Sequence, residues 1–363
     1  MCGGRLTQLV VLDTTPFHSR SRDSAAIKMP PPSRWQLVLA ATTAIGAVSI
    51  AIWLRRRRRN LLPGGRTVIG RYKSRVESAD RPWYKEIVVT EERVDSVTAI
   101  RSLHLGSEDT VPESRVTMRN GEAIVDLRHK QHLQYTLLAF AWLGRGFEAN
   151  DEGEPARAAL IGVAGGSLLH FWRERVPGGS ELLVDAVELD GAVLDAARDH
   201  LGLSACETPP NGKCTFHVGD GAAFLREAED EAYDLLVVDL DMGALVSNTD
   251  HKKKHDPARD MYRVLSSRGV LVVNEFSEEP VAERLESSLR LVRQLRRFFP
   301  EVHQIRTTTH HNVMVVAAVD RKGGTDAAGL ALKASRIQFG DVDLGNLMAT
   351  LPANRHQVYA HDK

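Results

Sequence analysis

The chain has 363 residues, of which 43% are hydrophobic and 26% are charged, so it is long enough to bury one α/β core of about 200 residues and a small appended domain. Its 47 basic and 47 acidic side chains cancel, which argues against nucleic acid as a partner. The cysteines Cys2, Cys206 and Cys214 have no zinc-ligand spacing, so we predict no metal site. Cys206 and Cys214 could meet across their loop, but free thiols in a reducing compartment are the favoured interpretation.

The first strong signal along the chain is an uncharged run of twenty residues, 35–54, followed by five arginines at 55–59. At about 1.5 Å per residue, a helix of this length spans roughly the 30 Å of a hydrocarbon core. We therefore expect a tail at 1–34, a single transmembrane helix at 35–54, and a basic stop and linker at 55–82. The arginines favour a cytosolic position for everything that follows. A buried core helix and a cleaved targeting sequence for mitochondrial or plastid import are the alternatives.

A glycine-rich turn follows the first apolar run of the central region. The run at 160–163 reads as a buried strand, and 167–175 reads as a helix. Gly162, Gly165 and Gly166 permit positive φ and close backbone approach, so the turn could lie against a ligand while the helix offers free N–H groups. A purely structural glycine turn is the alternative.

Carboxylates follow the next three apolar runs. Glu188 ends the LLVDAV run, at about the spacing at which an acid accepts hydrogen bonds from a ribose diol in doubly wound folds. Asp220 follows the strand at 215–218, and Asp239 follows the strand at 235–238. The carboxyl ends of parallel strands converge on one crevice, so the sequence predicts a nucleoside site there. Each acid alone could also be a helix cap or a solvated turn residue.

Strands and helices continue to alternate after this region. The pattern predicts a helix at 256–265, a strand at 269–274, a long helix at 280–299, and closing strands at 302–306 and 312–319. Such βα alternation with a terminal hairpin is typical of an α/β fold built on a mostly parallel sheet.

The glycine turn and the segments VELD, HVGDG and YDLLVVDLD, in that order, resemble the class I S-adenosylmethionine-dependent methyltransferase fold in its spermidine-synthase-like branch. Upstream, WYKEIVVTEERVDSVTAIRSLHL and HLQYTLLAFAWL resemble the small β-rich domain and the helix that lead into the sheet of spermidine synthases. The resemblance implies a small β-rich domain at 83–150 and a Rossmann-like, seven-stranded methyltransferase sheet at 151–320. Residues 321–363 are then a C-terminal tail.

The resemblance also implies roles for individual residues. Six of them would bind the cofactor: Gly162, Gly165, Gly166, Glu188, Asp220 and Gly221. The three glycines of the turn would lie beside the amino acid moiety of S-adenosylmethionine. Glu188 would hold the ribose hydroxyls and Asp220 the adenine amino group, with Gly221 letting the chain turn under the ring. Asp239 would be the catalytic aspartate that accepts a proton from the attacking amine.

The chain departs from the family at the polyamine side of the site. Gly165 stands where spermidine synthases have the aspartate that grips the charged aminopropyl group, and the Asp-Ser-x-Asp-Pro segment is replaced by residues 239–243, DLDMG. Thr136 and Leu137 replace a histidine and a glutamate after Tyr135. A methyl group carries no charge, whereas an aminopropyl group brings an ammonium that must be paired or solvated. The favoured interpretation is therefore methyl transfer to an amine, on a protein or a small molecule.

Two alternatives remain open at this point. The first is a spermidine-synthase-type aminopropyltransferase of polyamine biosynthesis, which would use decarboxylated S-adenosylmethionine. The second is a catalytically silent, membrane-anchored scaffold. The resemblance also raises a homodimer, paired through the small β-rich domain, as a partner hypothesis.

Overall fold

The computed structural model divides the chain into two units, Met1–Arg57 and Arg58–Lys363. It describes residues 65–76, 84–125, 155–175, 181–207, 214–240, 256–276, 281–306, 312–319, 338–339, 342–343 and 356–360, all in the second unit. Among these residues, no helix combines the length and the apolar character needed to cross a bilayer. The predicted transmembrane helix at 35–54 lies outside the described residues, as does the helical segment expected before the main sheet.

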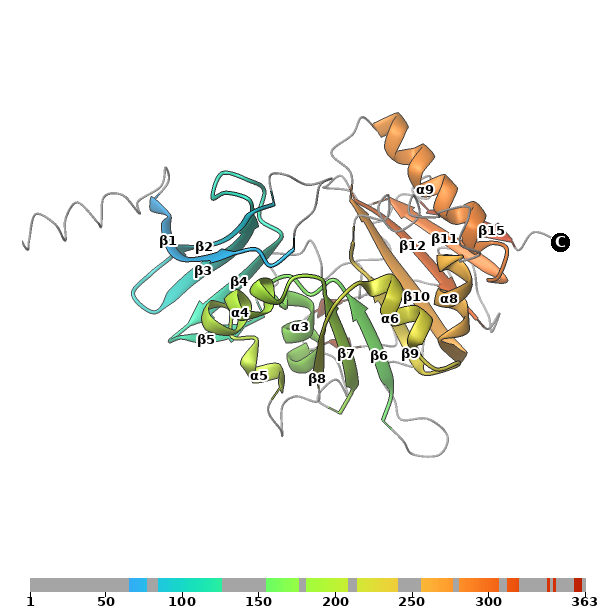
Figure 1. The fold of residues 1–363 in the computed structure, drawn as a ribbon, viewed down its shortest axis with the longest axis horizontal. Coiled ribbons are helices and arrows are strands. Elements are labelled where there is room, and N and C mark those ends of the chain that lie inside the picture. The colour runs from blue at the N-terminus through green and yellow to red at the C-terminus, as the bar shows by residue number, and fades with distance from the viewer. Residues whose placement is uncertain are drawn as a thin grey trace, which may run out of the picture. The chain divides into compact units, whose positions relative to one another are not determined.

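A five-stranded antiparallel sheet forms the N-terminal part of the described chain (Figure 1). Its strands follow each other in sequence order: β1 (Thr67–Lys73), β2 (Glu86–Arg93), β3 (Thr98–Leu105), β4 (Ser114–Arg119) and β5 (Glu122–Ile124). This sheet begins before the β-rich domain predicted at 83–150, because β1 lies inside the segment 55–82 predicted as a basic stop and linker. A register shift between Val68 and Gly70 interrupts the two-residue alternation of β1. This irregularity hid the strand in the sequence.

The main sheet has eight strands in the order β15-β11-β12-β10-β9-β6-β7-β8. The five strands β8, β7, β6, β9 and β10 run parallel, and β12, β11 and β15 are antiparallel additions. Their bounds are β6 (Arg157–Ile161), β7 (Leu183–Glu188), β8 (Cys214–Val218), β9 (Tyr233–Val238), β10 (Leu265–Phe276), β11 (Glu301–Arg306), β12 (Asn312–Ala318) and β15 (His356–Ala360). The seven strands predicted at 151–320 are therefore present.

The eighth strand lies within residues 321–363, the segment predicted as a C-terminal tail. β15 pairs antiparallel with β11, so that His303 faces Val358 and Gln304 faces Gln357. A separate two-stranded ribbon, β13 (Gln338–Phe339) and β14 (Val342–Asp343), precedes it. The strand is only five residues long and follows a long stretch without apolar periodicity, so no pattern in the sequence pointed to it.

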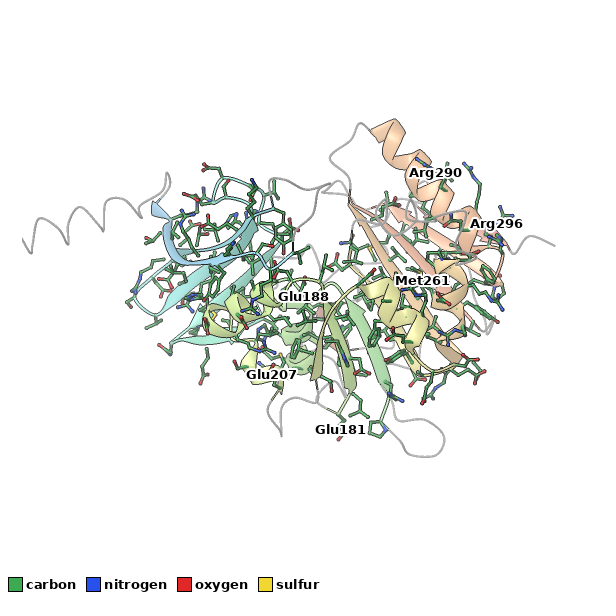
Figure 2. All side chains as sticks on the ribbon, viewed as in Figure 1. Glu181, Glu188, Glu207, Met261, Arg290 and Arg296 are labelled. Carbon is green, nitrogen blue, oxygen red and sulfur yellow. The ribbon has the colours of Figure 1, made fainter. Side chains whose placement is uncertain are left out.

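Helices cover both faces of the main sheet. Their bounds are α3 (Ser167–Arg175), α4 (Gly191–His200), α5 (Ser204–Glu207), α6 (Gly221–Glu227), α8 (Pro257–Arg263) and α9 (Val281–Leu295). One apolar cluster joins α3 and α4 to Leu160 and Val184, and the other joins α6, α8 and α9 to Ile161 and Val187. Met261 of α8, labelled in Figure 2, belongs to the second cluster. The central strands are buried on both faces, which explains their uninterrupted apolar sequences.

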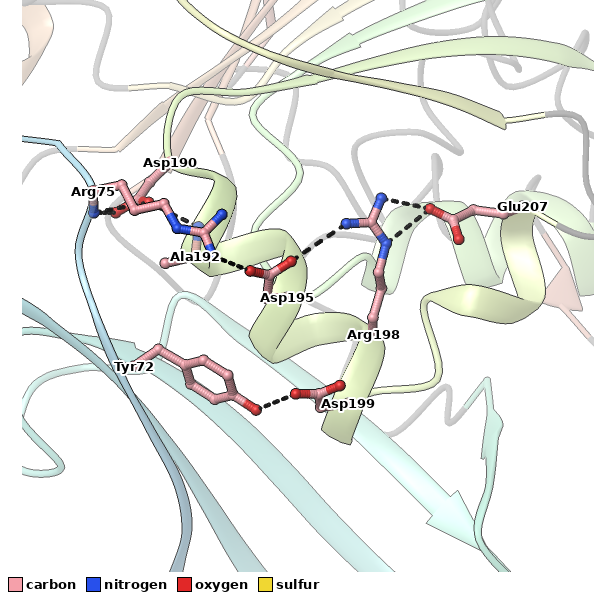
Figure 3. A network of polar contacts seen from close by, with 8 residues as sticks. All are labelled: Tyr72, Arg75, Asp190, Ala192, Asp195, Arg198, Asp199 and Glu207. Atoms are coloured by element: carbon pink, nitrogen blue, oxygen red, sulfur yellow. Dashed lines mark hydrogen bonds and ion pairs between the residues drawn. The ribbon is translucent and has the colours of Figure 1, made fainter.

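The small sheet docks onto α4, which contacts β1, β2 and β3. Polar side chains reinforce this contact (Figure 3): the Tyr72 hydroxyl donates to Asp199 Oδ2 at 2.7 Å, and Arg75 forms an ion pair with Asp195. On the same helix, Arg198 binds Glu207 of α5 at 2.6 Å. The strands and helices around the carboxyl ends of β6 and β7 are thereby held together from the side of the small sheet.

Candidate functional site

The glycine turn after β6 passes between the ends of β7 and β9. Gly162 has φ +93°, and a Cβ there would lie 2.2 Å from the carbonyl oxygen of Asp239. The Gly162 N–H donates to the Val187 carbonyl, which fixes the turn to β7 as well. Ala164 has φ +47°, a left-handed conformation that is uncommon for a residue with a side chain. Gly162 is thus required by close approach of two chain segments, and the strain at Ala164 marks the turn as a constrained feature.

Glu188 ends β7 and holds the glycine turn with its carboxylate. Its Oε2 accepts hydrogen bonds from the Val163 and Ala164 N–H groups, both at 3.1 Å, and its Oε1 accepts from the Asp190 N–H at 3.3 Å. Burial raises the pKa of this carboxyl above its ordinary value, and the backbone donors oppose the shift. The sequence predicted Glu188 as a ribose ligand. The structure adds a role that the sequence did not predict, the ordering of the glycine turn.

Asp220 and Gly221 lie at the start of α6, directly after β8. Asp220 is exposed and caps the helix, because its Oδ1 accepts from the Ala222 N–H at 2.8 Å. A Cβ on Gly221 would lie 2.2 Å from Cγ2 of Ile161, so this glycine is required by packing against the end of β6. The Gly219 N–H donates to the Glu188 carbonyl at 2.9 Å, which joins this segment to the end of β7. The adenine role predicted for Asp220 remains a prediction beside its observed role as a cap.

Asp239 directly follows β9 and lies beside a buried asparagine of β10. Asn274 donates from Nδ2 to Asp239 Oδ1 at 2.7 Å, and the preceding residues Val273 and Val238 are paired in the parallel register of these strands. We did not single out Asn274 in the sequence. The sequence pattern could have identified Asn274, because it is the polar residue at the end of the otherwise apolar strand predicted at 269–274. Asp241, the next acid along the chain, lies outside the described residues.

The predicted residues therefore gather at one edge of the sheet, but through different contacts. The glycine turn touches the Glu188 carboxylate and the backbone of Asp239, whereas Asp220 follows β8, one strand further out than β7 (Figure 1). Within the described residues, no group of three or more His, Cys, Asp or Glu side chains could hold a metal ion.

Two exposed apolar side chains border the same edge and were missed in the sequence. Leu189 is 48% exposed and directly follows Glu188, while Val218 is 63% exposed and ends β8. A Cβ built on Gly219 would meet no atom within 4 Å, so there is open space beside Val218. Exposed apolar groups beside acids at neighbouring strand ends can contact the faces of a planar ligand.

Asp190, the last residue of the VELD segment, is buried and joins the two sheets. It caps α4 by accepting from the Ala192 N–H at 2.8 Å. Its Oδ2 also accepts from the Ser74 hydroxyl at 2.6 Å and from the Tyr84 hydroxyl at 3.1 Å. Asp190 thus ties the strand end that carries Glu188 to the chain segments flanking β1 and β2.

Gly165 faces the small sheet and has no room for a side chain. Its N–H donates to the Ser114 hydroxyl at 3.0 Å, and a Cβ on Gly165 would lie 2.6 Å from the Ser114 Cβ and 3.0 Å from Cδ1 of Leu201. Ser114 is the buried first residue of β4. The position that the resemblance matches to the family's aspartate is therefore filled by neighbouring atoms.

Comparison with known proteins agrees with this architecture. Residues 164–322 match the family model described as spermine/spermidine synthase domain. The chain is 30% identical over 134 residues to a polyamine aminopropyltransferase of Clostridioides difficile (strain 630), a match that covers 35% of this chain and 44% of that protein. It is 27% identical over 141 residues to a polyamine aminopropyltransferase of Vibrio vulnificus (strain CMCP6), covering 38% of this chain and 44% of that protein. The chain thus spans less than half the length of these curated relatives.

A solved structure supports the same fold. The crystal structure of a probable spermidine synthase from Corynebacterium glutamicum ATCC 13032 superposes with a TM-score of 0.53 at 13% identity, covering 80% of this chain and 90% of that one. At this identity the likeness concerns the fold alone. The chain therefore carries a spermidine-synthase-like domain with the class I S-adenosylmethionine-dependent methyltransferase fold.

Proposed function

We propose that this chain is a transferase that binds the adenosyl part of S-adenosylmethionine, or of its decarboxylated form, and passes a group from the sulfonium to an amine. The observation that carries the proposal is the position of the Glu188 carboxylate at the end of β7. Its Oε2 orders the glycine turn by accepting hydrogen bonds from the Val163 and Ala164 N–H groups, both at 3.1 Å. The family match and the fold support it. In doubly wound folds, a ligand binds at this edge of the sheet.

The nucleoside would lie across the ends of β7 and β8. Glu188 would bind the ribose hydroxyls by sharing its carboxylate between the ligand and the turn, since hydrogen bonds to an ionised acceptor are strong. Leu189 and Val218, which are exposed at 48% and 63%, would contact the adenine ring. Asp220 would accept from the adenine amino group while it caps α6.

Asp239 would receive the acceptor amine. An alkyl amine has a pKa of about 10.4 and is protonated near neutral pH, so a carboxylate that orients it and removes a proton restores its nucleophilicity. The amine nitrogen then attacks the carbon on sulfur, the carbon–sulfur bond breaks, and its electron pair stays on sulfur as a neutral thioether. Asn274, whose amide donates to Asp239 Oδ1 at 2.7 Å, would hold the carboxylate in place during this step.

The nature of the transferred group divides two candidate reactions. The names of the curated relatives favour aminopropyl transfer. The local geometry favours methyl transfer, because Gly165 lies against Ser114 and Leu201 and leaves no space for an anion that would pair the aminopropyl ammonium. This geometry belongs to the chain itself, whereas the names belong to proteins of which it spans less than half. We therefore propose methyl transfer to an amine first and aminopropyl transfer second.

Parallel assays with the two donors test both reactions. S-adenosylmethionine labelled in its methyl group is offered with protein and small-molecule amines, and decarboxylated S-adenosylmethionine is offered with putrescine. Label transferred to an acceptor supports methyl transfer, and release of methylthioadenosine in the second assay supports aminopropyl transfer. Neither product, together with no binding of either donor, would overturn the proposal and leave the silent scaffold.

A pair of glutamate variants makes these assays specific to the site. Glu188→Ala removes the carboxylate at the carboxyl end of β7, whereas Glu181→Ala removes an exposed carboxylate near the amino end of the same strand (Figure 2). Loss of product with Glu188→Ala and full product with Glu181→Ala is the expected pattern. Equal loss in both variants would speak against the proposed site.

A further inference from the structure

Two cysteines in the described chain have no part in the proposed transfer reaction, and they lie together. Cys206 in α5 is buried, with 1% of its surface exposed, and Cys214, the first residue of β8, is half-buried. α5 and β8 are in contact. Each of these thiols has the largest influence on the pKa of the other. The sequence alone did not decide whether the two cysteines lie close together, because the residues between them carry no structural signal.

The surroundings of Cys206 favour its ionised form. The hydrogen bond from Cys214 is the largest influence that lowers the pKa of Cys206, and His170 and Arg173 add to it, although burial opposes the shift. Arg173 Nη1 lies 3.8 Å and His170 Nδ1 lies 3.9 Å from the Cys206 sulfur. The same pairing raises the pKa of Cys214. One thiol is thus prepared as a nucleophilic thiolate, while the other retains its proton.

Both thiols are attached to backbone that other contacts hold in place. Arg198 Nη2 binds Glu207 Oε1 at 2.6 Å, which ties the end of α5 to α4 (Figure 3). Cys214 is paired with Val184 in the main sheet. His170 donates from Nε2 to the Leu201 carbonyl oxygen, 2.9 Å away, which fixes the imidazole beside Cys206. The two cysteines therefore lie on neighbouring elements, α5 and β8, that other contacts hold in place.

We propose that Cys206 and Cys214 form a peroxide-sensitive site that closes to an intramolecular disulfide. The Cys206 thiolate attacks one oxygen of a hydroperoxide, the O–O bond breaks, and a sulfenic acid forms while hydroxide leaves and takes up a proton. The Cys214 sulfur then attacks the sulfenic sulfur, the S–O bond breaks, and water leaves with the Cys214 proton. Two thiols and one hydrogen peroxide yield one disulfide and two waters. The peroxide takes up the two electrons that the sulfur atoms lose.

The disulfide would form close to the glycine turn. Leu203, which precedes α5, packs against Gly166, since a Cβ on this glycine would lie 2.4 Å from Cδ1 of Leu203. The oxidation site and the turn therefore share a packing neighbour, although the proposed oxidation does not depend on the proposed transfer reaction.

The test uses the full reduced chain, carrying Cys2→Ser to remove the third cysteine, and a small excess of hydrogen peroxide. Free thiols are then alkylated, and the peptides are analysed by mass spectrometry. We expect a peptide pair linked through Cys206 and Cys214 and lighter by two hydrogen atoms. In Cys214→Ser, the reaction should stop at a Cys206 sulfenic acid that dimedone traps. In Cys206→Ser, oxidation of Cys214 should be slower by about tenfold or more, because no thiolate is prepared there.

Two further measurements test the proposal even if a serine variant of Cys206 or Cys214 fails to fold. Disulfide formation should slow when the Cys2→Ser chain is unfolded in urea, and Arg173→Gln should slow oxidation of Cys206 in the folded chain. Four results would overturn the proposal: links only between different chains, a stable Cys206 sulfenic acid without a link, equal oxidation rates of the two cysteines, or a faster reaction in urea.

Discussion

The absence of a side chain at Gly165 has one meaning in the sequence and another in the structure. In the sequence it is a departure from a family pattern, and in the structure it is a contact with Ser114, whose Cβ would lie 2.6 Å from a Cβ at 165. The contact gives the departure a physical basis, because β4 of the small sheet occupies the space. The proposal of methyl transfer ahead of aminopropyl transfer depends on this contact, so the contact is worth testing by itself.

Gly165→Ala should lower the free energy of unfolding by about 1 to 3 kcal/mol, the usual cost of overpacking. Because the clash is with Ser114, the same substitution should cost less in a Ser114→Gly background, although the contact with Leu201 remains. Chemical denaturation of the wild type, both single variants and the double variant measures this coupling. An equal cost of Gly165→Ala in both backgrounds would show that the contact with Ser114 is absent.

The raised pKa of Glu188 predicts how the free energy of unfolding depends on pH. Burial raises its pKa above the ordinary 4.5, so the folded chain binds the proton more tightly than the unfolded chain. Its contribution to the free energy of unfolding is therefore full below pH 4.5 and is lost as pH rises through the folded pKa. Relative to Glu188→Gln, the wild type should lose stability as pH rises from this value. Denaturant titrations of both proteins from pH 4 to pH 8 would contradict the account if the wild type gained stability instead.

At the scale of elements, α4 depends on one residue for two purposes. Asp190 caps this helix and accepts hydrogen bonds from Ser74 and Tyr84 of the N-terminal region. An isolated cap contributes about 1 kcal/mol, and loss of the hydrogen bonds from Ser74 and Tyr84 to the buried carboxylate costs a further 1 to 3 kcal/mol. The end of β7 and the small sheet should therefore lose order together when Asp190 is removed.

Asp190→Ala should lower the free energy of unfolding by roughly 2 to 4 kcal/mol. Asp256→Ala provides the matched control, since Asp256 caps α8 by accepting from the Ala258 N–H at 3.1 Å and otherwise makes an exposed ion pair with Arg297. This control should cost about 1 kcal/mol. Similar costs for the two variants, measured by urea unfolding, would argue against a junction role for Asp190.

β15 closes one edge of the main sheet, and its removal should be felt there. Deleting residues 350–363 would leave the backbone of β11 unpaired on one side, and such edges promote association with other chains. We expect a loss of roughly 1 to 3 kcal/mol in the free energy of unfolding and more self-association. Deleting residues 361–363 alone, which spares the strand, is the control. Unchanged stability and light scattering in the longer deletion would contradict the structural role of β15.

For the whole molecule, the sequence predicted what depends on local pattern. The parallel strands are apolar on both faces, so runs such as 235–238 and 269–274 were recognisable, and the glycines and acids that follow them marked the strand ends. β1 and β15 escaped because a bulge interrupts the alternation of one and the other is five residues long.

Contacts between distant segments could not be predicted in this way. Asn274 meets Asp239 because two strands 35 residues apart lie in register, and Ser114 meets Gly165 across 51 residues. Glu188 was recognised by its place at a strand end. Its hydrogen bonds to the glycine turn could not be predicted, because they depend on the three-dimensional path of the backbone. The helix predicted at 35–54 belongs to the part of the chain that the structure does not describe, and it remains a proposal.

The central proposal is that the carboxylate of Glu188 and the turn it orders form the binding site of an adenosyl ligand. Calorimetric titration of the full chain with S-adenosylmethionine and with its decarboxylated form measures this directly. We expect saturable binding of at least one ligand, weakened by about 1 to 3 kcal/mol in Glu188→Ala and unchanged in Glu181→Ala. No binding of either ligand at millimolar concentration, or equal affinity in wild type and Glu188→Ala, would contradict it.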